Sequence, residues 1–195
     1  GLFSDDGIDW VVWDSAHLNL EGPQRSLPVY VQPHVFERLY GKGGRLKCLA
    51  ACEEHLLHDW VYQGLRNPHI HVNQRDPGTI LVEYGPEDCK LGYVICQVLA
   101  DAVIARTFLF LTMDGTPEGD KLYERLRVNR YDKSHLGLDS LDTLRMTDFC
   151  SDPVLRRIFD ECGLSHIFEN LDFQGVLRTG YASSCRSYLG SKRLG

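Results

Sequence analysis

Residues 90–112 read KLGYVICQVLADAVIARTFLFLT. The stretch holds two long runs of β-branched, aromatic and aliphatic residues, Lys90–Leu99 and Ala102–Thr112, separated only by Ala100 and Asp101. Two such runs joined by two residues are typical of a β-hairpin, although this joint lacks the favoured Asn-Gly pair. We therefore expect an antiparallel pair of strands here, with the rest of the sheet built outward from it.

Strands and helices are also predicted before the hairpin. Strand-forming residues recur at four places, Ile8–Trp13, Leu27–Gln32, His69–Val72 and Thr79–Tyr84. Between the second and third of these we expect a short helix over His34–Tyr40 and a longer one over about residues 45–65. The longer helix is indicated by apolar residues that recur at three- and four-residue steps.

The chain after the hairpin is predicted to be helical. Thr116 suits the cap of a helix and Pro117 its first position, so we expect a helix from there to about Val128. Further helices are expected near residues 140–149 and over residues 152–162, the latter capped by Asp152 and ended by Gly163.

This order of elements predicts the α+β class, because consecutive strands are followed by segregated helices. We expect an antiparallel sheet of four to six strands packed by N-terminal helices, with a helical C-terminal extension. The predicted organisation is a single domain over residues 1–172, with a sheet core at 27–112 and a helical extension at 113–172. Residues 173–195 form a basic tail that we expect to be partly disordered.

Composition and charge restrict the function classes. The 195 residues are 43% hydrophobic and 25% charged, as in globular proteins. The net charge of −6 divides into +4 for residues 173–195 and −10 for residues 1–172, and an acidic body argues against tight nonspecific binding to nucleic acid. The longest apolar run, Ala102–Met113, is too short to span a bilayer, and no signal-peptide pattern is visible. Seven cysteines, none in a CxxC pair, favour free thiols and a cytoplasmic location.

The first candidate site is the segment His34-x-x-Glu37-Arg38. Residues four apart share one side of a helix, so His34 and Arg38 are expected to project together. A histidine that transfers protons beside an arginine that stabilises an anionic oxygen suits phosphodiester cleavage. On spacing alone the pattern favours a structural interpretation, in which His34 caps the helix and Glu37 and Arg38 are surface residues.

The second candidate is Arg106-Thr107 in the apolar run. A charge within an aliphatic strand is costly unless its face is wet or the charge is paired. Strict alternation places Arg106 on one face with Ile104, Phe108 and Phe110, and Thr107 on the other face. Arg106 then either marks a site on an open face or forms a salt bridge to Glu83.

A zinc site on the longer helix is a weaker alternative. Cys48, Cys52 and His55 form a stripe at helical spacing, and His58 lies on the same segment. One helix rarely completes a tetrahedral site, so we expect ordinary buried thiols and surface histidines and assign no metal or other cofactor.

Two segments resemble known families. Residues 27–112 resemble the RelE/BrnT-type toxin ribonucleases, in which a strand-led His-Ala-x-x-Arg segment precedes antiparallel strands that carry the cleavage residues. The matching segment is Val29–Arg38, with Val35 at the position of the usual Ala, and Thr79–Thr112 corresponds to the sheet. The body is acidic where such toxins are mostly basic, and the C-terminal helices have no counterpart in the minimal toxin. A family of uncharacterised bacterial proteins is also similar to this chain, over Lys90–Tyr93, Arg106–Thr112 and Gly115–Gly119.

The toxin resemblance implies a metal-independent endoribonuclease that uses the 2′-hydroxyl of its RNA as the nucleophile. His34 is then the general base or acid, Glu37 orients it, and Arg38 and Arg106 stabilise the phosphorane. Tyr93 and Thr107 are the expected substrate contacts. The implied partners are RNA or the ribosome and a small antitoxin-like protein, with no membrane.

The alternative hypothesis is a non-catalytic interaction module of a mobile element or phage-defence system. The acidic body favours it, because such a surface suits a basic partner. Geometry discriminates between the two hypotheses: the enzyme requires His34, Arg38 and Arg106 to converge on one exposed cleft.

Overall fold

The computed structural model describes residues 2–4, 7–9, 11–18, 23–73, 75–76, 78–86, 89–144, 146–147 and 151–169, without the side chains of 2–4, 7–9, 17, 48–56 and 169. The predicted basic tail at 173–195 and the side chains of Cys48, Cys52 and His55 therefore lie outside the described residues.

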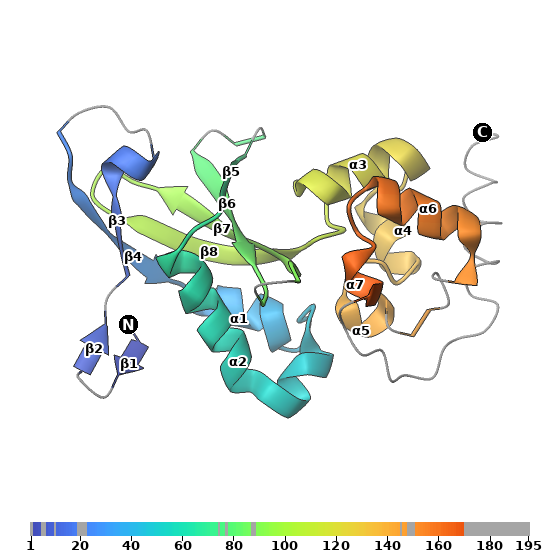
Figure 1. The fold of residues 1–195 in the computed structure, drawn as a ribbon, viewed down its shortest axis with the longest axis horizontal. Coiled ribbons are helices and arrows are strands. Elements are labelled where there is room, and N and C mark those ends of the chain that lie inside the picture. The colour runs from blue at the N-terminus through green and yellow to red at the C-terminus, as the bar shows by residue number, and fades with distance from the viewer. Residues whose placement is uncertain are drawn as a thin grey trace.

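A curled six-stranded sheet forms one half of the molecule (Figure 1). Its strands lie in the order β3 (Val12–Asp14), β4 (Ser26–Val31), β8 (Val103–Phe110), β7 (Gly92–Val98), β6 (Thr79–Tyr84) and β5 (Ile70–Val72). The expected hairpin is confirmed, because β7 and β8 pair antiparallel and the Leu99 amide donates to the Ala102 carbonyl at 2.8 Å. A separate small hairpin joins β1 (Leu2–Ser4) and β2 (Gly7–Asp9).

The α+β class is confirmed, but the prediction of a purely antiparallel sheet is wrong at one pair. β4 pairs with β8 in parallel, with Val29 opposite Val103 and Val31 opposite Ala105. Two helices and three strands separate β4 from β8 along the chain, as a parallel pair requires a long crossover. Local residue patterns carry no information about a pairing over such a distance.

Helix α1 (Pro33–Tyr40) continues from β4 along the flank of β8. The last hydrogen bond of the parallel ladder runs from the Gln32 amide to the Ala105 carbonyl at 2.9 Å. Pro33 follows directly and starts the helix, since proline has no amide hydrogen for a ladder but suits the first helical turn. Val35 and Leu39 are buried, so the helix holds His34 beside the middle of β8 and Arg38 one turn further on.

Helix α2 (Lys47–Arg66) packs on the sheet through two buried hydrogen bonds. The Trp13 indole donates to the Leu65 carbonyl at 2.6 Å, and the Tyr84 hydroxyl donates to the Leu57 carbonyl at 3.2 Å. The buried side chains form one continuous core that extends from Val11 in the sheet half to Ile167 in the helical half.

The helical half contains α3 (Pro117–Leu126), α4 (Arg130–His135), α5 (Leu141–Leu144), α6 (Pro153–Glu161) and α7 (His166–Glu169), and a short 3-10 helix, η1 (Ser15–Leu18), lies in the sheet half. The predicted caps are confirmed: Thr116 accepts from the Gly119 amide at 3.0 Å, and Asp152 accepts from the Val154 amide at 2.9 Å. Gly163 has a positive φ of 78°, as expected at the end of α6. The sequence patterns did not predict α4.

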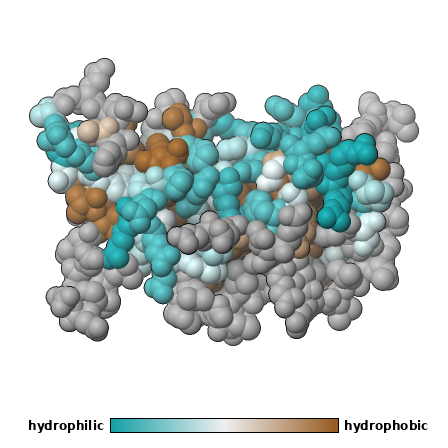
Figure 2. Space-filling view, viewed as in Figure 1, coloured by the Kyte–Doolittle hydropathy of each residue, from teal (hydrophilic) through white to brown (hydrophobic). Residues whose placement is uncertain are grey.

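The surface of the helical half is mainly hydrophilic around α3 and α6, whereas apolar atoms gather on the sheet half near β3 and β5 (Figure 2). No helix in the described part of the chain has both the length and the apolar character needed to cross a membrane. Cys89, Cys96 and Cys162, the cysteines with described side chains, are buried free thiols, in line with the expectation of unpaired cysteines.

Gly92 is the tightest point of the hairpin and provides a test of the sheet. A Cβ atom there would lie 2.2 Å from the Leu109 carbonyl oxygen and 2.5 Å from the Phe108 ring. We expect Gly92→Ala to lower the free energy of unfolding by about 1–3 kcal/mol, the usual cost of overpacking, in a urea titration. Gly43→Ala is the control, because nothing lies within 4 Å of its added Cβ. Equal stability of the two variants would contradict this packing.

Candidate active site

A β-bulge at Arg106 determines the direction of the side chains on β8. Ile95 of β7 lies opposite Thr107, and the next residue, Cys96, lies opposite Ala105, so Arg106 is an extra residue without a partner. A bulge shifts the alternation of a strand by one position and commonly redirects a side chain next to a functional site. Arg106 is consequently exposed, while Ala105 and Phe108 on either side of the bulge are both buried.

The predicted alternation at Arg106 is therefore wrong. Arg106 does not share a face with Phe108 and Phe110, which are fully buried, and it is not on the opposite face from Thr107. Of the two alternatives for Arg106, the salt bridge to Glu83 is wrong, because Arg106 Nη1 donates to Oε1 of Gln97 at 2.9 Å. The partner of Arg106 in this hydrogen bond is a neutral amide, so the contact does not neutralise the positive charge of the guanidinium group.

His34, Arg106 and Thr107 line one pocket of about 520 Å³, which we call the bulge pocket. The Glu37 carboxylate lies 3.1 Å from Nδ1 of His34, and both side chains are exposed, at 54% and 70%. Because an ionised carboxylate only accepts hydrogen bonds, Nδ1 is the donor in this pair. In the neutral ring, Nε2 is then the basic nitrogen and is available to a substrate.

Arg38 lines a neighbouring pocket of about 550 Å³, which we call the arginine pocket. Its charged lining consists of four cations and two carboxylates, namely Arg38, Arg45, Arg130, Lys133, Asp114 and Asp139. Leu109 and Asp114 line both pockets, so the two adjoin across a shared wall. The three predicted residues thus do not share one pocket: His34 and Arg106 line the bulge pocket, and Arg38 lines the arginine pocket on the other side of the shared wall.

The carboxylates of the arginine pocket are already engaged. Arg45 Nη1 lies 2.6 Å from Oδ2 of Asp139, and Lys133 Nζ lies 2.5 Å from Oδ1 of Asp114. Arg38 and Arg130 make no ion pair with any carboxylate in the described part of the chain, which leaves two guanidinium groups in excess. Burial, followed by the positive charges of Arg45 and Arg130, lowers the pKa of Arg38, and Asp139 opposes this only in part.

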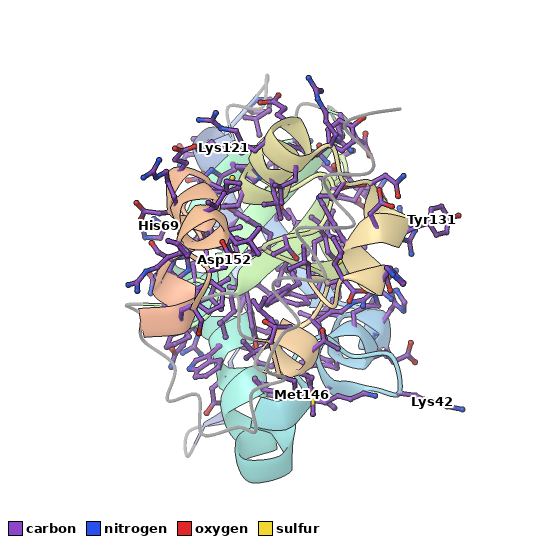
Figure 3. The ribbon with its side chains drawn as sticks, turned by 90° about the vertical axis from the view of Figure 1, so that its right-hand side faces the viewer. Lys42, His69, Lys121, Tyr131, Met146 and Asp152 are labelled. Atoms are coloured by element: carbon purple, nitrogen blue, oxygen red, sulfur yellow. The ribbon has the colours of Figure 1, made fainter. Side chains whose placement is uncertain are left out.

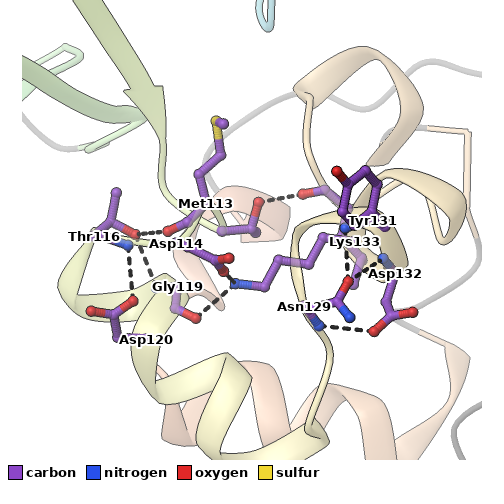
Figure 4. A network of polar contacts seen from close by, with 12 residues as sticks. Met113, Asp114, Thr116, Gly119, Asp120, Asn129, Tyr131, Asp132 and Lys133 are labelled. Atoms are coloured by element: carbon purple, nitrogen blue, oxygen red, sulfur yellow. Dashed lines mark hydrogen bonds and ion pairs between the residues drawn. The ribbon is translucent and has the colours of Figure 1, made fainter.

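Lys133 connects α4 to the end of the sheet (Figure 4). Its side chain is only 2% exposed, and besides Asp114 its ammonium group donates to the Gly119 carbonyl at 2.9 Å. Desolvation lowers the pKa of Lys133, and the contact with Asp114 opposes this shift. The pair fixes Asp114, the shared wall of the two pockets, against the helical half.

A capping box sets the start of α4. The Asn129 side chain accepts from the amides of Tyr131 and Asp132 at 2.9 and 3.2 Å, and the Asp132 carboxylate accepts from the Asn129 amide at 2.9 Å. This reciprocal cap places Arg130 and Tyr131 at the rim of the arginine pocket. The Tyr131 ring is 84% exposed and points away from the body of the molecule (Figure 3).

The predicted substrate contact Tyr93 is fully buried and does not line either pocket. Its hydroxyl donates to the buried Glu118 carboxylate at 3.0 Å and accepts from Lys90 Nζ at 2.9 Å. Lys90 in turn lies 2.7 Å from Glu118. Tyr93 therefore belongs to a buried network that joins β7 to α3, and a substrate role for it is wrong in this arrangement because α3 covers it.

The sequence did not identify Arg45, Arg130, Tyr131 and Lys133 of the arginine pocket, nor Arg75, Asp76 and Asp114 of the bulge pocket. The signal for Arg130, Tyr131 and Lys133 was the spacing Asn129-x-x-Asp132, which is that of a capping box. Arg45 had no local signal, because it reaches the site through the long-range contact with Asp139.

The zinc alternative has no support among the described side chains, where no group of three or more His, Cys, Asp or Glu residues is arranged to hold a metal. His58 instead shares a hydrogen bond of 2.6 Å with the Tyr40 hydroxyl and stacks on Phe36.

The comparisons with known proteins add no assignment: no family model matches this chain, and no curated protein or solved structure gives a significant match. A functional assignment therefore depends on the geometry of the two pockets.

The acid side of the stability profile tests the network around Glu83. Burial raises the pKa of Glu83, but hydrogen bonds from His71 and Lys90 outweigh it and hold the pKa below 4.5. A lowered carboxyl pKa gives stability above pH 4.5 that is lost as the pH falls through the folded-state pKa. We expect Glu83→Gln to be less stable at pH 7 and to lose less stability between pH 5 and 3 in urea titrations. Glu124→Gln on the exposed face of α3 is the control, and parallel profiles of Glu83→Gln and wild type would contradict this network.

Removal of the carboxylate at Asp114 tests the link between the two halves. Asp114→Ala leaves the buried Lys133 ammonium with only the Gly119 carbonyl as a partner. Breaking a buried pair in this way costs about 3–5 kcal/mol, which we expect in the free energy of unfolding at pH 7. Glu124→Ala, a carboxylate on an exposed helix face, should change stability by less than about 0.5 kcal/mol. Equal effects of the two substitutions would show that the pair contributes little.

Proposed function

We propose that this protein is a metal-independent endoribonuclease whose active site is the bulge pocket. The observation that carries the proposal is that the bulge places Arg106 and Thr107 in one pocket with His34, whose Nδ1 lies 3.1 Å from the Glu37 carboxylate. A base, a group that orients the base, and a cation beside them are the parts that phosphodiester cleavage requires. None of these roles needs a bound metal.

The chemistry follows from the contacts of His34. Nε2 of His34 takes the proton of the RNA 2′-hydroxyl, and the 2′-oxygen attacks the adjacent phosphorus. The bond from phosphorus to the 5′-oxygen then breaks, and His34 returns the proton to that leaving oxygen. The products are a 2′,3′-cyclic phosphate and a 5′-hydroxyl, so all atoms and charges balance.

The cations stabilise the charge that develops on the phosphorane. Arg106 lies in the same pocket as His34, and Arg38 lines the adjoining one across Leu109 and Asp114. Preorganised donors of this kind lower the barrier because they need not reorganise during the reaction. Thr107 contributes a hydroxyl to the same pocket and contacts the substrate.

The toxin resemblance supports the same reaction class for residues 27–112. Its two key segments, the start of α1 and the strands through β8, are those that form the bulge pocket. In this proposal the substrate is RNA, either free or on the ribosome. A small antitoxin-like protein would inhibit the enzyme by covering the pocket.

Cleavage of a labelled single-stranded RNA in the presence of EDTA tests the proposal. We expect His34→Ala to lower the rate constant about 100-fold or more, the range of general acid-base catalysis, and Arg106→Ala to lower it by a similar factor. The all-deoxy oligonucleotide should remain uncleaved, and mass spectrometry should find a 2′,3′-cyclic phosphate on the RNA product.

His69→Ala and Arg157→Ala are matched controls, since both side chains are exposed and line neither pocket. They should cleave at the wild-type rate. The proposal is contradicted if His34→Ala and Arg106→Ala cleave as fast as the wild type and the two controls. It is also contradicted if the wild type itself shows negligible cleavage.

A protein-interaction module is the second candidate function. Val12 and Tyr30 are 50% and 52% exposed on the neighbouring strands β3 and β4, and residues 1–172 carry the acidic charge of the chain. An apolar patch within an acidic surface suits a small basic protein. In that case a stoichiometric basic partner should co-purify from the native host, and Tyr30→Ala should release it.

A further inference from the structure

We propose that the arginine pocket binds a phosphate of single-stranded RNA next to the scissile one, and that Tyr131 stacks on the base attached to it. The choice of RNA as the ligand rests on the proposed ribonuclease function. Arg130 and Tyr131 lie outside residues 27–112, so the subsite is a feature of the helical half of this chain.

The charge balance of the pocket argues for an anion. Asp139 and Asp114 neutralise Arg45 and Lys133, whereas Arg38 and Arg130 have no carboxylate partner in the described part of the chain. The Nε atom of Arg45 is also buried without an acceptor among the described atoms. A local excess of positive charge in an otherwise acidic protein attracts a phosphate specifically to this position.

The position of Tyr131 argues for a nucleotide rather than for a free inorganic anion. The capping box holds Tyr131 at the rim of the arginine pocket, where 84% of its surface is exposed and available to a base. Proteins that bind single strands combine cationic grooves with aromatic side chains on which unpaired bases stack. Paired bases cannot stack on such a ring, so the subsite selects single-stranded RNA over a duplex.

The shared wall places the subsite next to the proposed active site. Leu109 and Asp114 belong to both pockets, so a phosphate in the arginine pocket lies across this wall from one in the bulge pocket. One strand can therefore place its scissile phosphate at His34 and Arg106 and a neighbouring nucleotide at Arg130 and Tyr131.

Binding of an uncleavable strand tests this inference separately from cleavage. The probe is a fluorescein-labelled 2′-O-methyl oligoribonucleotide, which lacks the nucleophile, and the measurement is fluorescence anisotropy at several salt concentrations. We expect Tyr131→Ala to weaken binding about 5- to 150-fold, the range for loss of one base stack, and Tyr131→Phe to restore it. Arg130→Ala should reduce the slope of log affinity against log salt by about 0.7, the effect of one phosphate contact on a single strand.

Tyr123→Ala and Arg157→Ala are matched controls on exposed faces of α3 and α6 and should bind as the wild type does. A duplex of the same sequence should bind more weakly than the single strand. The inference is overturned if Tyr131→Ala and Arg130→Ala bind like the controls, or if Tyr131→Phe is as weak as Tyr131→Ala. If the wild type cleaves no RNA but Tyr131→Ala and Arg130→Ala still weaken binding as expected, only the ribonuclease function is contradicted.

Discussion

The extra residue that β8 accommodates at Arg106 is the constraint on which the site depends. In a strand without the bulge, Arg106 would lie on the same face as the buried Phe108 and Phe110, and Thr107 would lie on the opposite face. Hydrophobic burial on both sides of the bulge fixes the strand, because Ala105 and Phe108 must both face the core. The extra residue leaves one position of β8 unpaired, and as a result the Arg106 side chain is exposed beside α1.

The second determinant is the parallel pairing of β4 with β8. It ends at Gln32, and Pro33 turns the chain into α1 at the level of the bulge. The helix then carries His34 to one pocket and Arg38 to the next. On the other side, the Asp114–Lys133 pair holds α4 against the same wall, so residues of the helical half line the arginine pocket.

The sequence was sufficient for the elements whose signals are local. The β7–β8 hairpin, β6, α1, α2 and α3 with its Thr116 cap follow from periodicity and capping preferences within a few residues. The bulge, the parallel pair and α4 could not be read in this way. A bulge is decided by the partner strand, a parallel pair by a distant segment, and α4, with six residues, is too short to show an apolar period. Of the residues that the sequence suggested for the candidate site, His34, Arg38, Arg106 and Thr107 line the two pockets and Glu37 contacts His34, whereas Tyr93 is buried against Glu118 of α3.

A crystal structure of the protein with the uncleavable 2′-O-methyl strand tests the central claim most directly. The account predicts one phosphate between the His34 imidazole and the Arg106 guanidinium, with Arg106 turned from Gln97 toward that phosphate. A strand bound elsewhere on the surface, with Arg106 still donating only to Gln97, would contradict it.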